Sequence, residues 1–519
     1  MSRTVMQHYV MAAVDIGSHS IRMKISEVDP AGSIRVLETT KKSINLGKDT
    51  FISGRIKHDN VEELCSILKN CKKLINEFGT DKSMIVGTSA LREAENCEYI
   101  LDYLYQKTGL KIEVISESEE RFYTYGSIID SLEIFPELKK EGVLITDIGS
   151  GGAEITLFNH GNLVFTQYIR MGALRLKEVL SDLERNTLNF PNLIGEYIES
   201  EIDTLKIPLI QNQVKNFLVI GSEIQVMHDI LGNKKKDYNK SYITREAFYR
   251  LYHQIIGRSR QQIMEKYGLS SENVETLVPA LLMYEEFLSF TKSDRIYTPG
   301  VSLCDGLTRY MTDKKFGFEN RAFSEADIVI SVKKLGERYA YDARHAEQVE
   351  KIALQLFDNT RKLHGYSGRE RLKLQIAAIA HDFGKYINIK GHNILSQNII
   401  LNSDILGLSK SDLHIIANII RYHANTLPEA DDFNYRYLDY ESRIMVSKLA
   451  AYLKIADALD RSHKQKLANI TAVLNDRTLT IKAEATRDSL LEEWEFENKC
   501  NLFKDIYGIK PGLIIKDIK

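Results

Sequence analysis

The chain is poor in the residues that mark disulfide-rich, collagen-like and low-complexity proteins. Its 519 residues include only 8 prolines, 30 glycines, 1 tryptophan and 5 cysteines, so these classes are excluded. The cysteines form no CxxC pair and are too few for a disulfide framework or a structural zinc site in a chain of this length. We therefore expect five reduced thiols, at Cys65, Cys71, Cys97, Cys304 and Cys500.

The sequence also lacks an excess of charge of either sign and lacks a long apolar run. Lys and Arg number 69 against 71 Asp and Glu, so no overall positive field attracts nucleic acid or an acidic membrane. A polyanion would need a local basic site, for which residues 234–236 (KKK), Arg258 and Arg260 are candidates. Asp15 interrupts the only apolar run near the N-terminus. We expect a cytoplasmic protein that binds neither nucleic acid nor membranes.

The most informative feature that is present is an internal repeat. Residues 12–25 read AAVDIGSHSIRMKI and residues 144–157 read LITDIGSGGAEITL. Each copy has an apolar run, the tetrapeptide DIGS, a short polar turn and a second apolar run, which is typical of two strands joined by a tight turn. The repeat predicts one domain that occurs twice, with the two turns facing each other.

The rest of the chain falls into an α/β part and a helical part. Residues 61–78 have helical periodicity, and residues 82–96 and 111–129 each read as strand, turn and helix, which favours α/β layers. From about residue 316 the pattern becomes long amphipathic helices, and seven of the 13 histidines fall within 345–463. We predict domains at 1–128, 129–315 and 316–463, followed by a small α+β domain at 464–519.

The paired turns suit the binding of phosphate. Backbone amides exposed by glycine can hold phosphate oxygens, and a carboxylate at the strand end can hold a divalent cation or orient water. The alternative is that Asp15 and Asp147 only begin tight hairpins, since Asp and Gly favour turns in any case. The repetition of the acid together with the small residues favours phosphate.

Several motifs, taken together and in order, resemble the exopolyphosphatase and guanosine pentaphosphate phosphohydrolase (Ppx/GppA) family. They are VDIGSHSIRM (14–23), GTSALREAEN (87–96), VISESEE (114–120), TDIGSGGAEI (146–155), YIRMGALRL (168–176) and NIIRYH (418–423). The resemblance implies two actin-like domains of the ribonuclease H-like superfamily that includes sugar kinases and heat-shock ATPases. It also implies hydrolysis of a terminal phosphoanhydride bond, with water as the acceptor, in the cleft between them.

The resemblance assigns roles to particular residues. The general base for the attacking water maps onto Glu120, with Glu119 beside it, and the carboxylates of the second turn map onto Asp147 and Glu154. Asp15 has the equivalent place in the first turn, and Mg²⁺ is expected in the cleft. Phosphate is expected at Gly17, Ser18, Gly149, Ser150, Gly151, Gly152 and, as one of two open interpretations, Arg92. The other interpretation of Arg92 is a salt bridge to a nearby acid.

The chain departs from the family pattern at four turns. The usual DIGSNS is DIGSHS here, with His19 in place of Asn, and DIGGGSTE is DIGSGGAE. Gly152 and Ala153 thus replace a Ser-Thr pair, which removes two hydroxyl donors. A third phosphate turn that usually ends in Gly-Thr is GSE at 221–223, and a later Gly-Leu-Arg-Glu-Gly is SLCDG at 302–306.

The helical part contains His345, His381-Asp382 and Asp457 in the order of the HD metal-dependent phosphohydrolase superfamily. Histidine nitrogens and carboxylate oxygens together suit Mn, Fe, Zn or Mg. Asp382 follows an apolar helix, where an unpaired carboxylate is costly and a bound cation would offset that cost. The alternative is an HD-like domain that acts only as a scaffold for dimerisation and polyphosphate binding. His392, His414 and His423 are either outer ligands or surface residues.

The sequence therefore predicts a phosphohydrolase that releases terminal phosphate from inorganic polyphosphate or guanosine pentaphosphate. We expect polyphosphate or guanosine penta- or tetraphosphate as its ligand, and a homodimer. One alternative is an HD-centred hydrolase that uses Mn²⁺ or another divalent metal. The other is a polyphosphate or alarmone sensor without catalysis.

Overall fold

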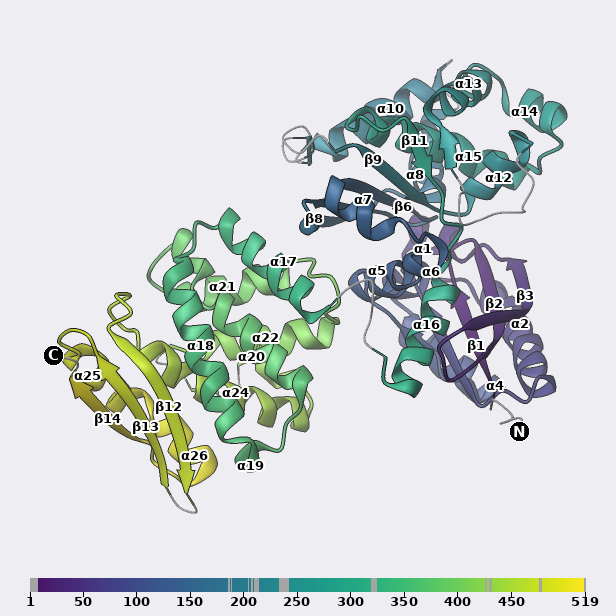
Figure 1. Ribbon diagram of the computed structural model, residues 1–519. Coiled ribbons are helices and arrows are strands. Elements are labelled where there is room, and N and C mark those ends of the chain that lie inside the picture. The colour runs from purple at the N-terminus through teal and green to yellow at the C-terminus, as the bar shows by residue number, and fades with distance from the viewer. Residues whose placement is uncertain are drawn as a thin grey trace, which may run out of the picture. The chain divides into compact units, whose positions relative to one another are not determined.

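The computed structural model describes residues 8–184, 187, 189–203, 205–206, 209, 214–232, 242–318, 324–424, 427–428, 432–475 and 478–517. The chain forms two compact units, Met1–Ser324 and Glu325–Lys519 (Figure 1), and each is described by itself. The basic segment 234–236 lies outside the described residues. Within the described part, all five cysteines are free thiols, and no helix is both long and apolar enough to cross a membrane.

The first unit is built on two sheets with the same internal plan. The first sheet has the strand order β3-β2-β1-β4-β5, and the second has the order β10-β11-β9-β6-β7-β8. The strands of the first sheet are β1 (Tyr9–Ile16), β2 (Ser20–Val28), β3 (Ile34–Ser43), β4 (Lys82–Gly87) and β5 (Glu113–Val114). The strands of the second sheet are β6 (Val143–Ile148), β7 (Ala153–Asn159), β8 (Asn162–Ile169), β9 (Asn216–Ile220), β10 (Tyr242–Thr244) and β11 (Arg295–Tyr297).

The strand pairing confirms the repeat predicted from the two DIGS segments. In each sheet three antiparallel strands come first, namely β1, β2 and β3 or β6, β7 and β8. A strand that follows a helical connection then pairs in parallel with the first strand, β4 with β1 and β9 with β6. Because both copies share this order, Asp15 and Asp147 end equivalent strands.

Helices cover these sheets, and their apolar faces follow the 3.6-residue period. In α2, for example, the buried side chains are Val61, Leu64, Cys65, Leu68, Cys71 and Ile75. The other helices of the first half are α1 (Leu46–Ser53), α3 (Ser89–Glu93), α4 (Cys97–Thr108), α5 (Glu117–Gly126), α6 (Ile128–Ser131) and α7 (Phe135–Glu141), with α2 at His58–Glu77. The later ones are α8 (Ala173–Val179), α9 (Ser181–Glu184), α10 (Phe190–Glu201), α12 (Glu223–Ile230), α13 (Arg245–Ile256), α14 (Arg260–Tyr267), α15 (Ser271–Ser289) and α16 (Leu303–Phe316).

The last helix of the first unit returns to the first sheet. Leu303, Leu307 and Met311 of α16 share one buried cluster with Met11 and Ala13 of β1. The predicted domain boundaries place α16 in the second actin-like domain, whereas its packing belongs to the first. The contiguous segment 129–315 is therefore not one packing unit.

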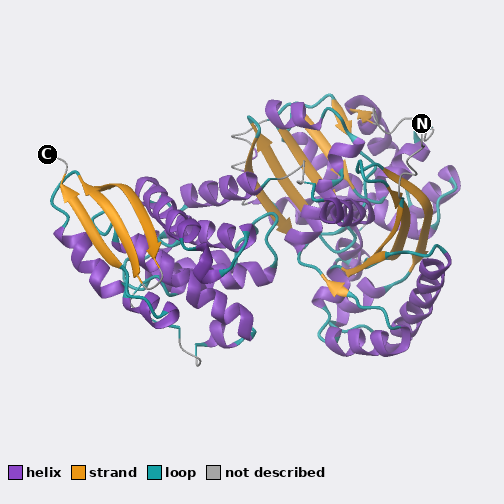
Figure 2. Cartoon of the chain, turned by 60° about the horizontal axis from the view of Figure 1, so that its bottom comes forward, coloured by secondary structure: helices purple, strands orange, loops and turns teal. Residues whose placement is uncertain are grey.

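The second unit contains a helical layer and a small sheet (Figures 1 and 2). The helices are α17 (Glu325–Arg338), α18 (Ala343–Asn359), α19 (Arg361–His364), α20 (Gly368–Ala380), the 3₁₀ helix η2 (Phe383–Tyr386), α21 (His392–Leu401), α22 (Lys410–Arg421), α23 (Phe433–Arg436) and α24 (Tyr440–Ala458). The C-terminal part adds β12 (Leu467–Asn475), β13 (Thr478–Ala485), α25 (Leu490–Lys499), α26 (Asn501–Tyr507) and β14 (Gly512–Asp517). One buried apolar cluster runs through both parts, so the tail and the helices share a core.

Candidate functional site

The residues predicted from the two DIGS turns line one cavity in the first unit. The lining includes Asp15, Gly17, Ser18, Arg92, Glu120, Asp147, Gly149, Ser150, Gly151, Gly152 and Glu154. These residues come from both sheets and from the helices that follow β4 and β5. Glu119 is the one predicted residue of this set that is not part of the lining.

Both turns close in the same way and leave amides available. The Gly17 amide donates to the Ser20 carbonyl at 3.0 Å, and the Gly149 amide donates to the Gly152 carbonyl at 2.9 Å. Among the described residues, the amides of Ser18 and Ser150 donate to no protein group. Backbone amides that are removed from water nearly always find a partner, so these two are suited to bind the oxygens of a ligand.

Glycine at position 151 allows the two turns to approach each other. A Cβ atom at this position would lie 2.3 Å from the Ser89 Oγ atom, so a side chain here would force Ser89 to move. The Ser89 hydroxyl also lies 2.8 Å from the Ser18 hydroxyl. The first-sheet residues and the second turn therefore face each other closely enough to contact one phosphate chain from two sides.

Glu120 lies at the cavity beside a buried arginine. The Arg92 side chain is 6% exposed, and its guanidinium lies 3.3 Å from a Glu120 carboxylate oxygen and 2.9 Å from Glu117. Burial raises the pKa of Glu120, and the charge of Arg92 opposes that rise. Of the two interpretations of Arg92, the structure thus contains the salt bridge, which holds Glu120 in place at the edge of the cavity.

Glu119 has a structural role that the sequence interpretation missed. Its carboxylate accepts hydrogen bonds from the Ser116 amide at 2.9 Å and from the Ser116 hydroxyl at 2.7 Å. The Ser116 hydroxyl in turn accepts from the Glu119 amide, which completes a capping box at the start of α5. The carboxylate is used by the cap and does not line the cavity, so the structure gives Glu119 a capping role in place of the predicted catalytic one.

Glu154 is also engaged by an arginine. The fully buried Arg121 approaches the Glu154 carboxylate at 3.3 Å and donates to Thr166 at 2.6 Å. The pair lies on strand β7 and helix α5, directly under the cavity. Arg121 therefore holds the Glu154 carboxylate in place beside the cavity that it lines.

The two strand-end aspartates are strongly affected by burial. Burial raises the pKa of Asp15 and the pKa of Asp147 to about 7 in each case, and nearby Arg22 opposes both shifts. Asp15 Oδ1 is buried and has no hydrogen-bond partner among the described residues. Two poorly solvated carboxylates of this kind favour a bound cation.

The cavity also contains residues that the sequence interpretation did not single out. They include Arg22, Thr88, Ser89 and Tyr168. Arg22 could have been found from the repeat, because it pairs with Asp15 across β1 and β2 as Glu154 pairs with Asp147 across β6 and β7. Among the described residues its guanidinium has no ion-pair partner, so it is a cation available to phosphate.

The altered turns are accommodated by local contacts. The His19 ring lies 3.4 Å from Glu272 of α15. Glu223 is 5% exposed, and its carboxylate accepts from the Ser222 hydroxyl at 2.9 Å. Asp305 caps α16 and pairs with Lys24 at 2.6 Å. Asp305 is therefore paired with a lysine, whereas Glu223 Oε2 is buried without a hydrogen-bond partner among the described residues.

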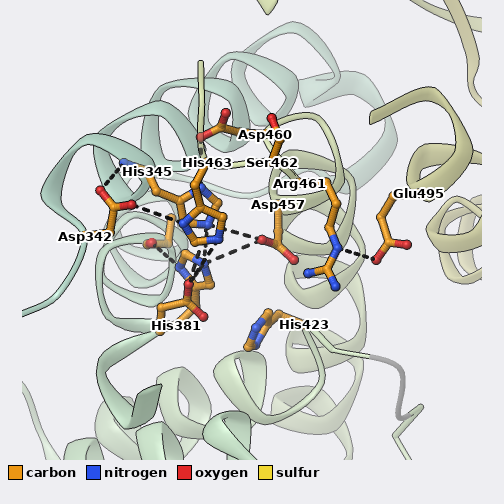
Figure 3. A network of polar contacts seen from close by, with 12 residues as sticks. Asp342, His345, His381, His423, Asp457, Asp460, Arg461, Ser462, His463 and Glu495 are labelled. Carbon is orange, nitrogen blue, oxygen red and sulfur yellow. Dashed lines mark hydrogen bonds and ion pairs between the residues drawn. The ribbon is translucent and has the colours of Figure 1, made fainter. Parts of the chain in front are cut away.

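The second unit brings the four predicted metal ligands together. His345 Nε2 lies 3.2 Å from His381 Nε2, 3.4 Å from Asp457 Oδ1 and 3.6 Å from Asp382 Oδ2. Around a tetrahedral ion with bonds of about 2.0–2.1 Å, ligand atoms lie roughly 3.3 Å apart. Figure 3 shows His345, His381 and Asp457 converging in this way. The donor set and its spacing fit a divalent metal.

The histidine rings are oriented by their other nitrogens. His345 Nδ1 lies 2.9 Å from Asp460 Oδ2, and His381 Nδ1 lies 2.7 Å from the Ala378 carbonyl. His423 Nδ1 likewise lies 2.6 Å from the Ile420 carbonyl. Such contacts fix Nε2 toward the centre, as in known histidine metal sites. Burial lowers the pKa of His381 and that of His423. Burial also acts to lower the pKa of His345, but hydrogen bonds to Asp457 and Asp460 raise it to about 9, so binding of a metal would have to displace a proton from this ring.

A second group of possible ligands shares Asp382. His392 Nε2 lies 3.4 Å from Asp382 Oδ1 and 3.2 Å from His423 Nε2. Asp382 Oδ2 thus faces His345 and His381, and Asp382 Oδ1 faces His392. His423 and His392, left open by the sequence interpretation, belong to this cluster, while His414 is exposed on α22.

Lysines neutralise both carboxylates of the cluster, which corrects the argument from an unpaired carboxylate. Lys385 lies 2.5 Å from Asp382 Oδ2, and Lys499 of α25 lies 2.5 Å from Asp457 Oδ2. Bringing in a buried lysine offsets the cost of a buried carboxylate without a metal. The fit of the cluster to a metal therefore depends on the donor geometry alone.

Comparisons with known proteins agree with this division of the chain. Residues 25–315 match the model of the Ppx/GppA phosphatase family, and residues 329–501 match the model of Ppx/GppA phosphatase, domain III. The chain is 24% identical over 517 residues to a guanosine-5'-triphosphate,3'-diphosphate pyrophosphatase of Vibrio atlanticus, covering 98% of each chain. It is 21% identical to the protein of that name from Aeromonas salmonicida, covering 91% of each.

Among solved structures, the crystal structure of an exopolyphosphatase from Cytophaga hutchinsonii is similar to this chain. It is 18% identical, with a TM-score of 0.52, over 59% of this chain and 98% of that chain. This likeness agrees with two actin-like domains in the first unit.

Proposed function

Because this chain belongs to the Ppx/GppA phosphatase family, we propose that it releases the terminal phosphate of inorganic polyphosphate or of guanosine pentaphosphate in the cavity of the first unit. One observation carries the proposal. The Glu120 carboxylate lines the same cavity as the two glycine turns and the cation Arg22. These are the parts that phosphoryl transfer to water needs, since its transition state is stabilised by positioning and by neutralisation of charge.

The proposed reaction gives each of these groups a role. Amides of Ser18 and Ser150 hold the terminal phosphate, and Arg22 offsets its charge. Water at Glu120 attacks the terminal phosphorus, the phosphorus bond to the bridging oxygen breaks, and the shortened substrate leaves with the electron pair of that bond. Glu120 accepts the proton that the water loses. Arg92 contributes by holding the Glu120 carboxylate and by favouring its ionised form.

We propose Asp15 and Asp147 as the residues that would hold Mg²⁺. Members of this family depend in general on divalent metals, and Mg²⁺ is usually bound by one or two carboxylates together with substrate phosphates and water. The unpartnered Asp15 Oδ1 and the raised pKa values of both aspartates fit that arrangement. Bound Mg²⁺ would neutralise charge on the phosphate chain.

One similar protein is named a guanosine-5'-triphosphate,3'-diphosphate pyrophosphatase and another an exopolyphosphatase. The test therefore compares both substrates. Purified protein is assayed for phosphate release from polyphosphate and from guanosine pentaphosphate, with Mg²⁺ and Mn²⁺ in separate reactions. The proposal expects release from at least one substrate, and loss of that release in Glu120→Gln. Binding without release would support a polyphosphate or alarmone sensor instead.

The histidine cluster favours a second candidate function, a metal-dependent phosphohydrolase of the HD type in the second unit. The observation that supports it is the convergence of His345, His381, Asp382 and Asp457 at distances suited to a metal. Release that survives Glu120→Gln and is lost in His381→Ala would identify this unit as the catalyst. The homodimer stays a prediction.

A further inference from the structure

The hydroxyl of Tyr168 occupies the space that a side chain at position 152 would fill. A Cβ atom built on Gly152 would lie 2.2 Å from the Tyr168 hydroxyl oxygen and 2.3 Å from the ring carbon that carries it. Any side chain at position 152 and Tyr168 in its present place therefore exclude each other. Position 152 is where this chain lacks the serine of the related DIGGGSTE sequence.

The strand register aims Tyr168 at the cavity. Tyr168 of β8 pairs with Glu154 of β7, which pairs with Asp147 of β6. This row of three residues ends at the second turn, and all three line the cavity. The Tyr168 ring also lies beside Arg92, whose guanidinium carbon is 5.9 Å from the ring centroid. Tyr168 thus stands next to the group that holds Glu120.

The hydroxyl is suited to donate a hydrogen bond. Burial raises the pKa of Tyr168 above its ordinary value, and Arg92 only partly opposes the rise. The phenol is therefore neutral and keeps its proton at any pH at which the protein works. A neutral O–H donor adds no positive charge and can bind a phosphate oxygen beside the amides of the turn.

We propose that Tyr168 donates a hydrogen bond to the substrate phosphate. Its hydroxyl takes the place of the hydroxyl that a serine at position 152 would offer. The inference rests on the proposed phosphatase function of the cavity. Tyr168 and Gly152 form one unit, in which the glycine makes room and the tyrosine supplies the donor. The exchange makes up for one of the two hydroxyls that the altered turn has lost.

The first test removes the hydroxyl alone. Tyr168→Phe should lower kcat/KM for phosphate release, and weaken the binding of polyphosphate measured by calorimetry, by about tenfold to a hundredfold, because a hydrogen bond to a charged group is lost. Tyr249→Phe is the matched control, since its hydroxyl contacts Glu285 at 3.3 Å away from the cavity, and it should behave as the wild type. Unchanged kcat/KM and binding in Tyr168→Phe would overturn the inference.

The second test exchanges the two positions. Gly152→Ser alone should be impaired by the collision with Tyr168, and Tyr168→Ala alone should be impaired by loss of the donor. The double variant Gly152→Ser with Tyr168→Ala should exceed both single variants in kcat/KM by about tenfold, because it has a hydroxyl and space for it. A double variant no better than the worse single variant, with an unchanged melting temperature, would overturn the inference.

Direct binding separates this inference from the proposed function. If the wild type binds polyphosphate without releasing phosphate, and Tyr168→Phe weakens that binding, the enzymatic function fails and the role of Tyr168 stands. If the wild type binds neither polyphosphate nor guanosine pentaphosphate, both are wrong.

Discussion

At the scale of single residues, the pairing of Arg92 with Glu120 decides the charge of the proposed base. Burial alone would raise the pKa of Glu120 further, and Arg92 keeps the carboxylate closer to its ionised form. The same guanidinium also donates to the Ile115 carbonyl at 2.8 Å, so its position is fixed by the backbone. Arg92 acts on the reaction through Glu120 and does not need to touch the phosphate.

Removal of Arg92 should therefore change the pH dependence of catalysis. In Arg92→Gln the pKa of Glu120 rises, so the base loses its charge at a higher pH, and the acid limb of the kcat/KM profile moves toward higher pH. The profile is measured by phosphate release between pH 5 and pH 9. Arg170→Gln is the control, because its side chain is 71% exposed and 3.9 Å from Glu93. An acid limb that stays in place would show that Arg92 does not tune Glu120.

Residues of the two turns could be predicted from the sequence, because each turn is a local motif. Arg22 and Tyr168 could not be singled out in this way, since neither belongs to a turn, and Glu119 does not line the cavity. Two adjacent acids at a helix start look alike in the sequence, and only the capping contacts of Ser116 separate them. Lys499 could not be predicted either, because it reaches Asp457 from a helix 42 positions further along the chain.

At the scale of elements, the repeated hairpins and the strand-turn-helix segments follow their sequence patterns. β4 and α3 fall within residues 82–96, and β5 and α5 fall within 111–129, as predicted. The return of α16 to β1 was not predictable, because its apolar face fits any sheet and the sequence does not say which one. Tertiary contacts between distant elements decide such choices.

The end of α20 carries His381 and Asp382, and their joint replacement tests the metal cluster. The variant with Ala at both positions should contain no bound divalent metal by elemental analysis after metal-replete purification, and should melt at a lower temperature than the wild type. Phosphate release should persist, since Glu120 lies in the other unit. His414→Ala is the control, being an exposed histidine of the same unit. If elemental analysis found no divalent metal in the wild-type protein, the cluster would have only a structural role.

Helix α25 stabilises the cluster through Lys499. Its side chain is 6% exposed and Asp457 is 7% exposed, so Lys499→Met leaves a buried carboxylate without its cation, at a cost of about 3–5 kcal/mol. The metal-free variant should melt well below the metal-free wild type, and added Mn²⁺ should raise its melting temperature by more than that of the wild type. Lys504→Met, on the exposed side of α26, is the control. If Mn²⁺ raised the melting temperatures of Lys499→Met and of the wild type by the same amount, Lys499 and a metal would not both act on Asp457.

At the scale of the whole molecule, a net charge of −2 means that any polyanion is held by local cations against little overall attraction. The affinity for polyphosphate should therefore fall as salt rises, because screening weakens each local contact. Calorimetric titrations at about 50 mM and about 200 mM salt measure this. A dissociation constant that does not change would count against an extended basic track. Arg260, one of the candidates, already pairs with Glu275.

The chain consists of two units, and each unit contains its own candidate site. The first unit has amides, carboxylates and a cation around one cavity, and the second has a histidine cluster that suits a metal. The two kinds of site could be told apart in the sequence, because seven of the 13 histidines lie within residues 345–463. We propose that hydrolysis takes place in the first unit.

The rate of phosphate release by Glu120→Gln tests this assignment most directly. Because a general base contributes roughly 10² to 10⁴ in rate, the variant should lose at least about 100-fold in kcat while its dissociation constant for polyphosphate stays near that of the wild type. Glu119→Gln, which can keep the capping contacts, should retain most of the activity. Equal loss in the two variants, or full activity in Glu120→Gln, would contradict the account.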